Sequence, residues 1–210
     1  MLGIHDYGLF VIAGLLLNVT PGQDTMFILG RSLTGGLRAG LAAACGITAG
    51  SVFHTLAAAL GLSAILATSA LAFTVVKLLG AAYLVYLGAR LLFAPPPEPT
   101  AAGLAAASSV TARAAFLQGV VTNVLNPKVA LFFLAFLPQF IDRSSETQTV
   151  AFLALGATFI TTGLAWCLVL ALGAAQLQTF FARHPNARTL LDRAVGALFL
   201  ALGARLAWSR

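Results

Sequence analysis

Gly14-Leu-Leu-Leu-Asn-Val-Thr-Pro-Gly-Gln-Asp24 and Gly119-Val-Val-Thr-Asn-Val-Leu-Asn-Pro-Lys128 are the two stretches that decide the fold of this chain. Each lies inside a long hydrophobic segment and contains a proline, which cannot donate a backbone hydrogen bond and clashes with the carbonyl four residues earlier. At membrane depth, backbone broken in this way persists only where it is buried in protein or lines a wet cavity. The sequence therefore predicts two interrupted helices, one broken at Pro21 and Gly22 and the other at Pro127.

The composition is that of an integral membrane protein. The 210 residues are 60% hydrophobic and 9% charged, with a mean hydropathy of +0.95, whereas soluble domains carry roughly 25% charged residues. The net charge of +6 does not indicate nucleic-acid binding, because basic residues gather in the cytoplasmic loops of membrane proteins. Cys45 and Cys167 lack the spacing of metal ligands. We expect no metal, no cofactor and no nucleic acid.

Six apolar segments each come near the roughly 20 residues that span a bilayer. We place them at 7–29, 39–62, 70–93, 114–140, 148–173 and 190–208. The pair Gly35-Gly36 predicts a turn between the first two. The chain is then one all-α transmembrane domain over 1–210, with a first repeat at about 1–93, a linker at about 94–112 and a second repeat at about 113–210.

Two sequence repeats support this division. Gly14–Val19 is similar to Gly119–Val124, and Leu87–Leu91 recurs letter for letter as Leu202–Leu206. Each repeat holds three predicted helices, and an odd number of spans forces the second copy to enter the membrane upside down. The sequence therefore predicts two inverted three-helix repeats, with the first and fourth helices interrupted at the midplane and the binding site between the repeats.

Arginines set the predicted orientation. Most follow the odd-numbered spans: Arg31, Arg38, Arg90, Arg113, Arg183, Arg188 and Arg193. Fewer lie on the other side: Arg143, Arg205 and Arg210. Because short cytoplasmic loops are enriched in Lys and Arg, we expect both termini on the outer side.

Asp24 and Lys128 are the charged residues that directly follow the two breaks. A charge at the centre of a bilayer costs about 2.5–3.5 kcal/mol on insertion scales, so such residues are usually functional. Two interpretations stay open: a salt bridge that only holds the helices together, or a binding site. In the second, Lys128 binds a substrate carboxylate, and Asp24 binds the substrate amine or carries a coupled proton.

Four amide side chains lie in the same broken regions: Asn18, Gln23, Asn123 and Asn126. Their amides suit two roles equally well, capping the freed backbone groups or binding the substrate. Phe27, Phe132 and Phe133 follow nearby and either accommodate an aliphatic substrate side chain or face lipid.

His54 lies on one helical stripe with Gly46 and Gly50. Gly46-x-x-x-Gly50 lets a second helix approach closely. The histidine either caps this packing groove with a hydrogen bond or takes part in a proton relay with Asp24, since histidine titrates near neutral pH. Gly36-x-x-x-Gly40 is a second such motif, suited to packing within the chain or to a homodimer.

At these motifs the chain resembles the LysE-type amino-acid exporter family, in its homoserine/threonine and leucine efflux branch. The segments that carry the resemblance are Thr20–Asp24, Gly35–Gly40, Gly46–Gly50, Gly80–Gly88, Asn123–Lys128 and Phe136–Phe140. The resemblance implies a six-helix exporter of the bacterial inner membrane that is driven by proton exchange. The chain departs from the family pattern at Gln23, where the family usually has a second proline.

We therefore predict export of a small neutral amino acid, similar to leucine, threonine or homoserine, by alternating access and proton antiport. The expected partners are the amino acid, protons and the lipid bilayer. One alternative is a passive channel for small zwitterions on the same scaffold. An intramembrane enzyme of the aspartyl type would need two carboxylates, and Asp24 is the only acid well inside a predicted span.

Overall fold

A computed structural model describes residues 3–62, 70–93, 111–142 and 145–174, with isolated positions from 176 to 208. The linker predicted at 94–112 lies almost wholly outside the described residues, and the span predicted at 190–208 is described only at isolated positions. Of the second copy of the Leu87–Leu91 repeat, only Gly203 and Ala204 are described. The arginines of the orientation argument that lie outside the described residues are Arg143, Arg183, Arg188, Arg205 and Arg210.

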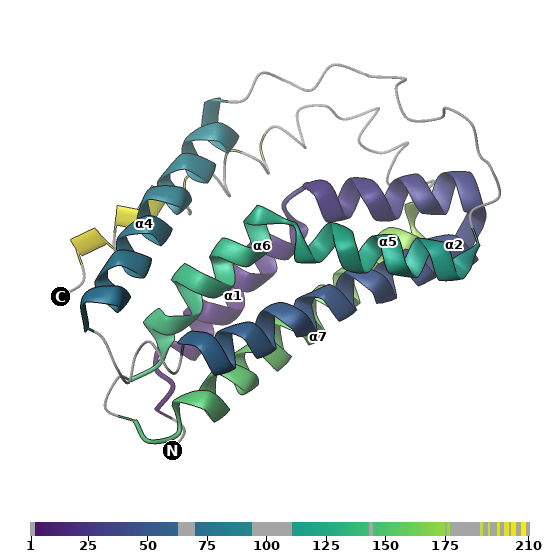
Figure 1. Cartoon of the computed structure of the whole chain (residues 1–210). Coiled ribbons are helices and arrows are strands. Elements are labelled where there is room, and N and C mark those ends of the chain that lie inside the picture. The colour runs from purple at the N-terminus through teal and green to yellow at the C-terminus, as the bar shows by residue number, and fades with distance from the viewer. Residues whose placement is uncertain are drawn as a thin grey trace.

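The described chain is helical (Figure 1). Its elements are α1 (Tyr7–Val19), α2 (Gln23–Ala57), η1 (Ala58–Leu62), α4 (Ala70–Phe93), α5 (Ala112–Val124), α6 (Pro127–Leu131), η2 (Phe132–Phe136), η3 (Leu137–Phe140) and α7 (Gln148–Leu172). Among the described residues the only extended pairing is one isolated bridge between Ile4 and Ile141. The all-α expectation is confirmed for this part of the chain.

Two helical segments are long and apolar enough to cross a membrane, Gln23–Gly61 and Gln148–Leu172. A third is obtained if Ala112–Val124 and Pro127–Phe140, which meet at a bend of 46°, count as one broken span. These numbers apply to the described residues. Six spans in two inverted repeats therefore stay a prediction.

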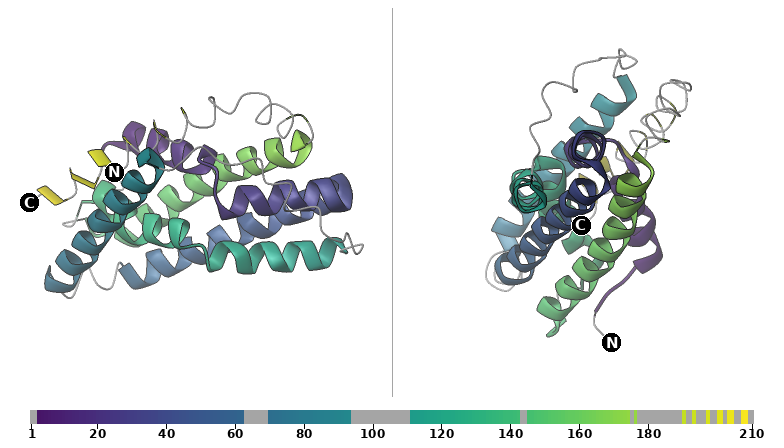
Figure 2. Two further views of the ribbon diagram at one scale, coloured as in Figure 1. Left: turned by 90° about the horizontal axis from the view of Figure 1, so that it is seen from above. Right: turned by 90° about the vertical axis from the view of Figure 1, so that its right-hand side faces the viewer.

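The long helix α2 turns back on itself at Gly36. This glycine has a φ of 73°, which lies in the left-handed region that glycine adopts without steric cost. Figure 1 and Figure 2 show the two parts of α2, 23–35 and 37–57, running in opposite directions. They come so close that a Cβ on Gly40 would collide with Ser32. The turn predicted at Gly35-Gly36 is confirmed.

Glycines allow α5 to pack tightly against the second part of α2. A Cβ on Gly46 would collide with the carbonyl of Phe116, and a Cβ on Gly119 would lie 2.8 Å from the carbonyl oxygen of Ala43. The close approach predicted from the Gly46 and Gly50 stripe is thus confirmed. On the other side of α2 lies α7, so the three helices stand in a row in the right-hand view of Figure 2.

Two clusters of buried apolar side chains form the core of the described chain. In the larger one, ring contacts join α1 to η2: the Phe132 ring lies 6.2 Å from Phe10 and 4.9 Å from Phe136. The smaller one joins both parts of α2 to α7 and includes Ile28, Ile47 and Leu170.

Candidate functional site

The first break lies between α1 and α2, at Thr20–Gly22. In a continuous helix the carbonyl of Leu17 would accept a hydrogen bond from residue 21, but Pro21 has no N–H. The ammonium of Lys128 takes this place: its Nζ donates to the carbonyl oxygens of Leu17 and Thr20, at 3.1 Å each. Gly22 gives the ammonium room, since a Cβ there would lie 3.2 Å from Nζ.

The second break lies between α5 and α6, at Leu125 and Asn126. The backbone N–H of Asn126 donates to the carbonyl of Asn123 at 2.9 Å, and the Asn126 side-chain oxygen accepts from the backbone N–H of Lys128 at 3.0 Å. Asn126 therefore caps the N-terminus of α6. Pro127 occupies the first helical position, where its missing N–H costs nothing.

A hydrogen-bonded chain joins the two breaks. Asp24 stands in the first turn of α2, and its Oδ2 accepts from Asn123 Nδ2 at 2.9 Å. Ser51 donates to Asn123 Oδ1 at 3.3 Å, so Asn123 is held from both sides. The other carboxylate oxygen, Asp24 Oδ1, is buried and has no hydrogen-bond partner among the described residues.

Asp24 and Lys128 line the same cavity. They form no ion pair within 4.0 Å, so the salt bridge considered from the sequence is not present between them. The cavity has a volume of about 30 Å³, which is room for two or three waters at about 10–15 Å³ each and too little for an amino acid. Its lining consists of Leu17, Asn18, Asp24, Thr25, Ile28, Ile47, Thr48, Ser51, Asn123, Lys128, Val129, Phe159, Ile160, Gly163, Leu164, Trp166, Cys167 and Leu170. The cavity is thus small and partly enclosed, and both polar and apolar side chains line it.

Of the four amides singled out in the sequence, two line the cavity, Asn18 and Asn123. Asn18 donates to Thr162 of α7 at 3.3 Å. Asn126 is buried behind the lining, where it caps α6, although its Nδ2 has no partner among the described residues. Gln23 is exposed and lies outside the cavity lining.

His54 is buried and lies beside the α5 break. Its Nε2 is 3.1 Å from the carbonyl oxygen of Asn123, and its ring stacks on Phe133 with centroids 5.8 Å apart. It does not line the cavity, and its connection to Asp24 runs through Asn123. This geometry matches the packing interpretation of the histidine, in which it caps the groove that Gly46 and Gly50 form.

Helix α7 supplies a wall of the cavity that the sequence argument did not anticipate. Gly163 lies against Asn18, so a Cβ there would be 3.3 Å from Asn18 Oδ1. Phe159, Trp166 and Cys167 also line the cavity, whereas Phe132 and Phe133 belong to the larger apolar cluster instead. The available signal was the small and polar residues Gly156, Thr158, Thr161, Thr162 and Gly163 in the middle of a mostly apolar helix. Within the described residues no group of three or more metal-ligating side chains converges.

Broken helices around a small cavity that charged and polar side chains line, in a helical chain of membrane-spanning character, are typical of a membrane transporter. The chain belongs to the LysE type translocator family, whose model matches residues 15–210. It is accordingly a membrane transporter of the amino-acid efflux kind and not an enzyme. The family resemblance stated from the motifs is confirmed.

Individual relatives are distant in sequence but similar in length. The chain is 30% identical over 206 residues to the leucine efflux protein of Salmonella choleraesuis, covering 98% of this chain and 96% of the relative. It is 32% identical over 211 residues, with the same coverage, to an uncharacterized membrane protein of Pseudomonas aeruginosa. The leucine efflux protein of Klebsiella pneumoniae is 28% identical over 205 residues, again covering 98% and 96%. No solved structure matches the chain.

Proposed function

We propose that this protein exports a small neutral amino acid from the bacterial cytoplasm across the inner membrane by alternating access, in exchange for protons. The observation that carries the proposal is the meeting of Asp24 and Lys128, one beside each helix break, in a single cavity. One carboxylate and one ammonium suit the two charges of a zwitterion. The similarity to leucine efflux proteins of Salmonella and Klebsiella supports an amino acid as the substrate.

Lys128 binds the substrate carboxylate in this proposal. An ammonium has three N–H donors, and the carbonyls of Leu17 and Thr20 take two of them. The third is left for an anion. Because Lys128 also holds the end of α1, a carboxylate that draws the ammonium away loosens that end, which links binding to movement of the broken helix.

Asp24 binds the substrate amine, or the proton that is exchanged for the substrate. Its Oδ1 is buried without a partner among the described residues, and a buried unpaired acceptor costs about 1–3 kcal/mol. Asn123 holds the carboxylate in place through Oδ2. His54 is connected to Asp24 only through Asn123. We therefore assign His54 to orienting the α5 break and not to a proton relay.

The rival function is a passive channel for zwitterions. The cavity between the two breaks, at about 30 Å³, is smaller than an amino acid, and this favours a site that changes shape to load its substrate. Accumulation against a gradient separates the two functions, because a channel only equalises concentrations.

The test is efflux from proteoliposomes that contain the purified protein. With labelled leucine, threonine or homoserine inside, we expect efflux that an imposed pH gradient accelerates, and a protonophore should remove that acceleration. Asp24→Asn and Lys128→Met should each reduce the rate about tenfold or more, since hydrogen bonds to charged groups contribute about 1.5–3 kcal/mol.

Glu146→Gln is the matched control, because it neutralises an exposed acid outside the cavity. It should leave the rate unchanged. Near-normal efflux in both cavity variants would remove the proposed roles, and efflux that never exceeds equilibration would favour the channel.

A further inference from the structure

Trp166 is the second cavity residue with an unused polar group. Its indole Nε1 is buried and has no hydrogen-bond partner within the described part of the chain. Trp166 stands on α7 and lines the cavity that Asp24 and Lys128 also line. A buried donor without a partner is costly, and native structures keep such groups where a water or a ligand can bind them.

Trp166 lies in the apolar part of the cavity. It packs against the cluster that contains Ile28, Ile47 and Leu170. Ile28 follows Asp24 by four residues, so it lies about 6 Å further along α2. Lys128 and Asp24 are thus placed to bind the carboxylate and the amine of an amino acid, and Trp166 is placed to contact its side chain.

Thr48 adds a matching acceptor to the cavity lining. Its hydroxyl donates to the carbonyl of Ala44 at 2.9 Å, which commits its hydrogen. The Thr48 oxygen keeps lone pairs that accept a further hydrogen bond. Trp166 therefore offers a donor and Thr48 an acceptor in the lining of the same cavity.

We infer that Trp166 is a specificity-determining residue, which contacts the substrate side chain and donates its indole N–H to an oxygen acceptor there. This inference rests on the proposed function, because it concerns the same cavity. A side-chain hydroxyl satisfies both Trp166 and Thr48, whereas a methyl group in its place leaves the indole N–H unpaired. Sites that bind a hydroxyl in this way reject analogues that lack it.

Threonine and valine are the probe pair, because they have the same shape and differ by a hydroxyl in place of a methyl group. In proteoliposomes the native protein should export threonine faster than valine at equal concentrations. Trp166→Phe keeps an aromatic ring and removes the N–H, so the threonine-to-valine ratio should fall by about 3- to 10-fold, the size of one neutral hydrogen bond.

Trp208→Phe is the matched control, since Trp208 is 88% exposed and is the other of the two tryptophans. It should leave the ratio unchanged. Thr48→Val should lower the ratio in the same direction as Trp166→Phe. An unaltered ratio in an active Trp166→Phe protein would overturn the inference while leaving the proposed function intact.

A second measurement keeps Trp166 and does not depend on transport. In the Trp208→Phe protein the remaining indole is that of Trp166, so its fluorescence reports the cavity. Threonine should shift the emission at lower concentration than valine does. Equal responses, or none, would contradict the contact. If the native protein exports neither probe nor any other amino acid, the proposed function itself fails.

Discussion

Asn123 connects the parts of the site. Its side chain donates to Asp24 and accepts from Ser51, and its carbonyl oxygen meets both His54 and the backbone N–H of Asn126. One residue at the end of α5 therefore orients the cavity carboxylate and stabilises the break. Its position depends on a residue without a side chain, Gly50, because a Cβ there would lie 2.6 Å from the Cβ of Asn123 and 2.7 Å from Oδ1.

Gly50→Ala should therefore disturb the site without removing any of its functional groups. The added methyl pushes Asn123 away from Asp24, and overpacking of this kind costs about 1–3 kcal/mol. We expect a lower melting temperature in detergent and reduced efflux. Gly30→Ala, in the same helix, is the control, because a Cβ there meets nothing within 4 Å. Equal behaviour of the two variants would show that Asn123 does not need its present position.

At the scale of elements, the two helix breaks look alike in sequence and differ in construction. Pro21 lies between two helices and deprives the Leu17 carbonyl of its intrahelical donor, which Lys128 replaces. Pro127 instead begins α6, in a break that Asn126 closes by capping. The lysine at the second break thus stabilises the first one.

This difference predicts unequal effects of proline substitution. Pro21→Ala restores an N–H that competes with Lys128 for the Leu17 carbonyl, so efflux should fall by about tenfold, the weight of one charge-assisted hydrogen bond. Pro127→Ala should keep activity within about twofold, because the first helical position needs no N–H. The measurement is the efflux rate of each variant, compared at equal amounts of protein in the membrane. Equal losses would mean that both prolines act only by bending the chain.

The sequence allowed the breaks, the Gly36 turn and the glycine packing to be predicted, because each follows from the local chemistry of proline or glycine. It also predicted that Asp24 and Lys128 belong together, through their positions after the breaks. The contribution of α7 was missed, since a helix that is apolar on most faces has no periodicity to show which face meets the cavity. The hydrogen-bond partner of His54 could not be predicted either, because it is a backbone carbonyl, which every residue has.

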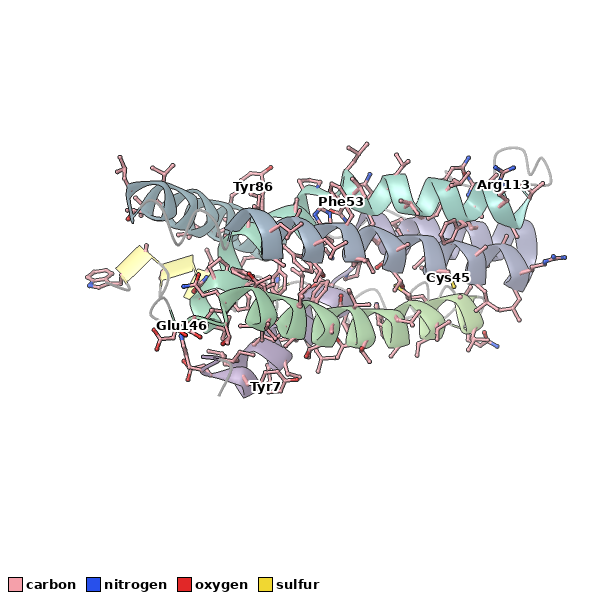
Figure 3. All side chains as sticks on the ribbon, turned by 60° about the horizontal axis from the view of Figure 1, so that its bottom comes forward. Tyr7, Cys45, Phe53, Tyr86, Arg113 and Glu146 are labelled. Carbon is pink, nitrogen blue, oxygen red and sulfur yellow. The ribbon has the colours of Figure 1, made fainter. Side chains whose placement is uncertain are left out.

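At the scale of the whole molecule, charges separate between the two ends. Arg31 bonds to Gln118 of α5 at 2.7 Å, and Arg38 follows the Gly36 turn, so both lie toward the end where α5 begins with Arg113. Acids mark the opposite end: Asp6, Asp142 and Glu146. Figure 3 shows Glu146 and Tyr7 at one end of the bundle and Arg113 at the other. Arg31, Arg38 and Arg113 therefore favour the Arg113 end as cytoplasmic.

Cysteine labelling tests this orientation directly. In a protein carrying Cys45→Ala and Cys167→Ala, which removes both natural thiols, a cysteine is introduced by Glu146→Cys or by Arg113→Cys; both positions are exposed. A membrane-impermeant maleimide added to intact spheroplasts should label the first variant and not the second, and inside-out vesicles should give the reverse. The direction matters for the transport cycle, because export requires the cavity to open toward the Arg113 end to load substrate and toward the Glu146 end to release it. Labelling of Arg113→Cys from outside would invert the assignment, and substrate would then load from the Glu146 end.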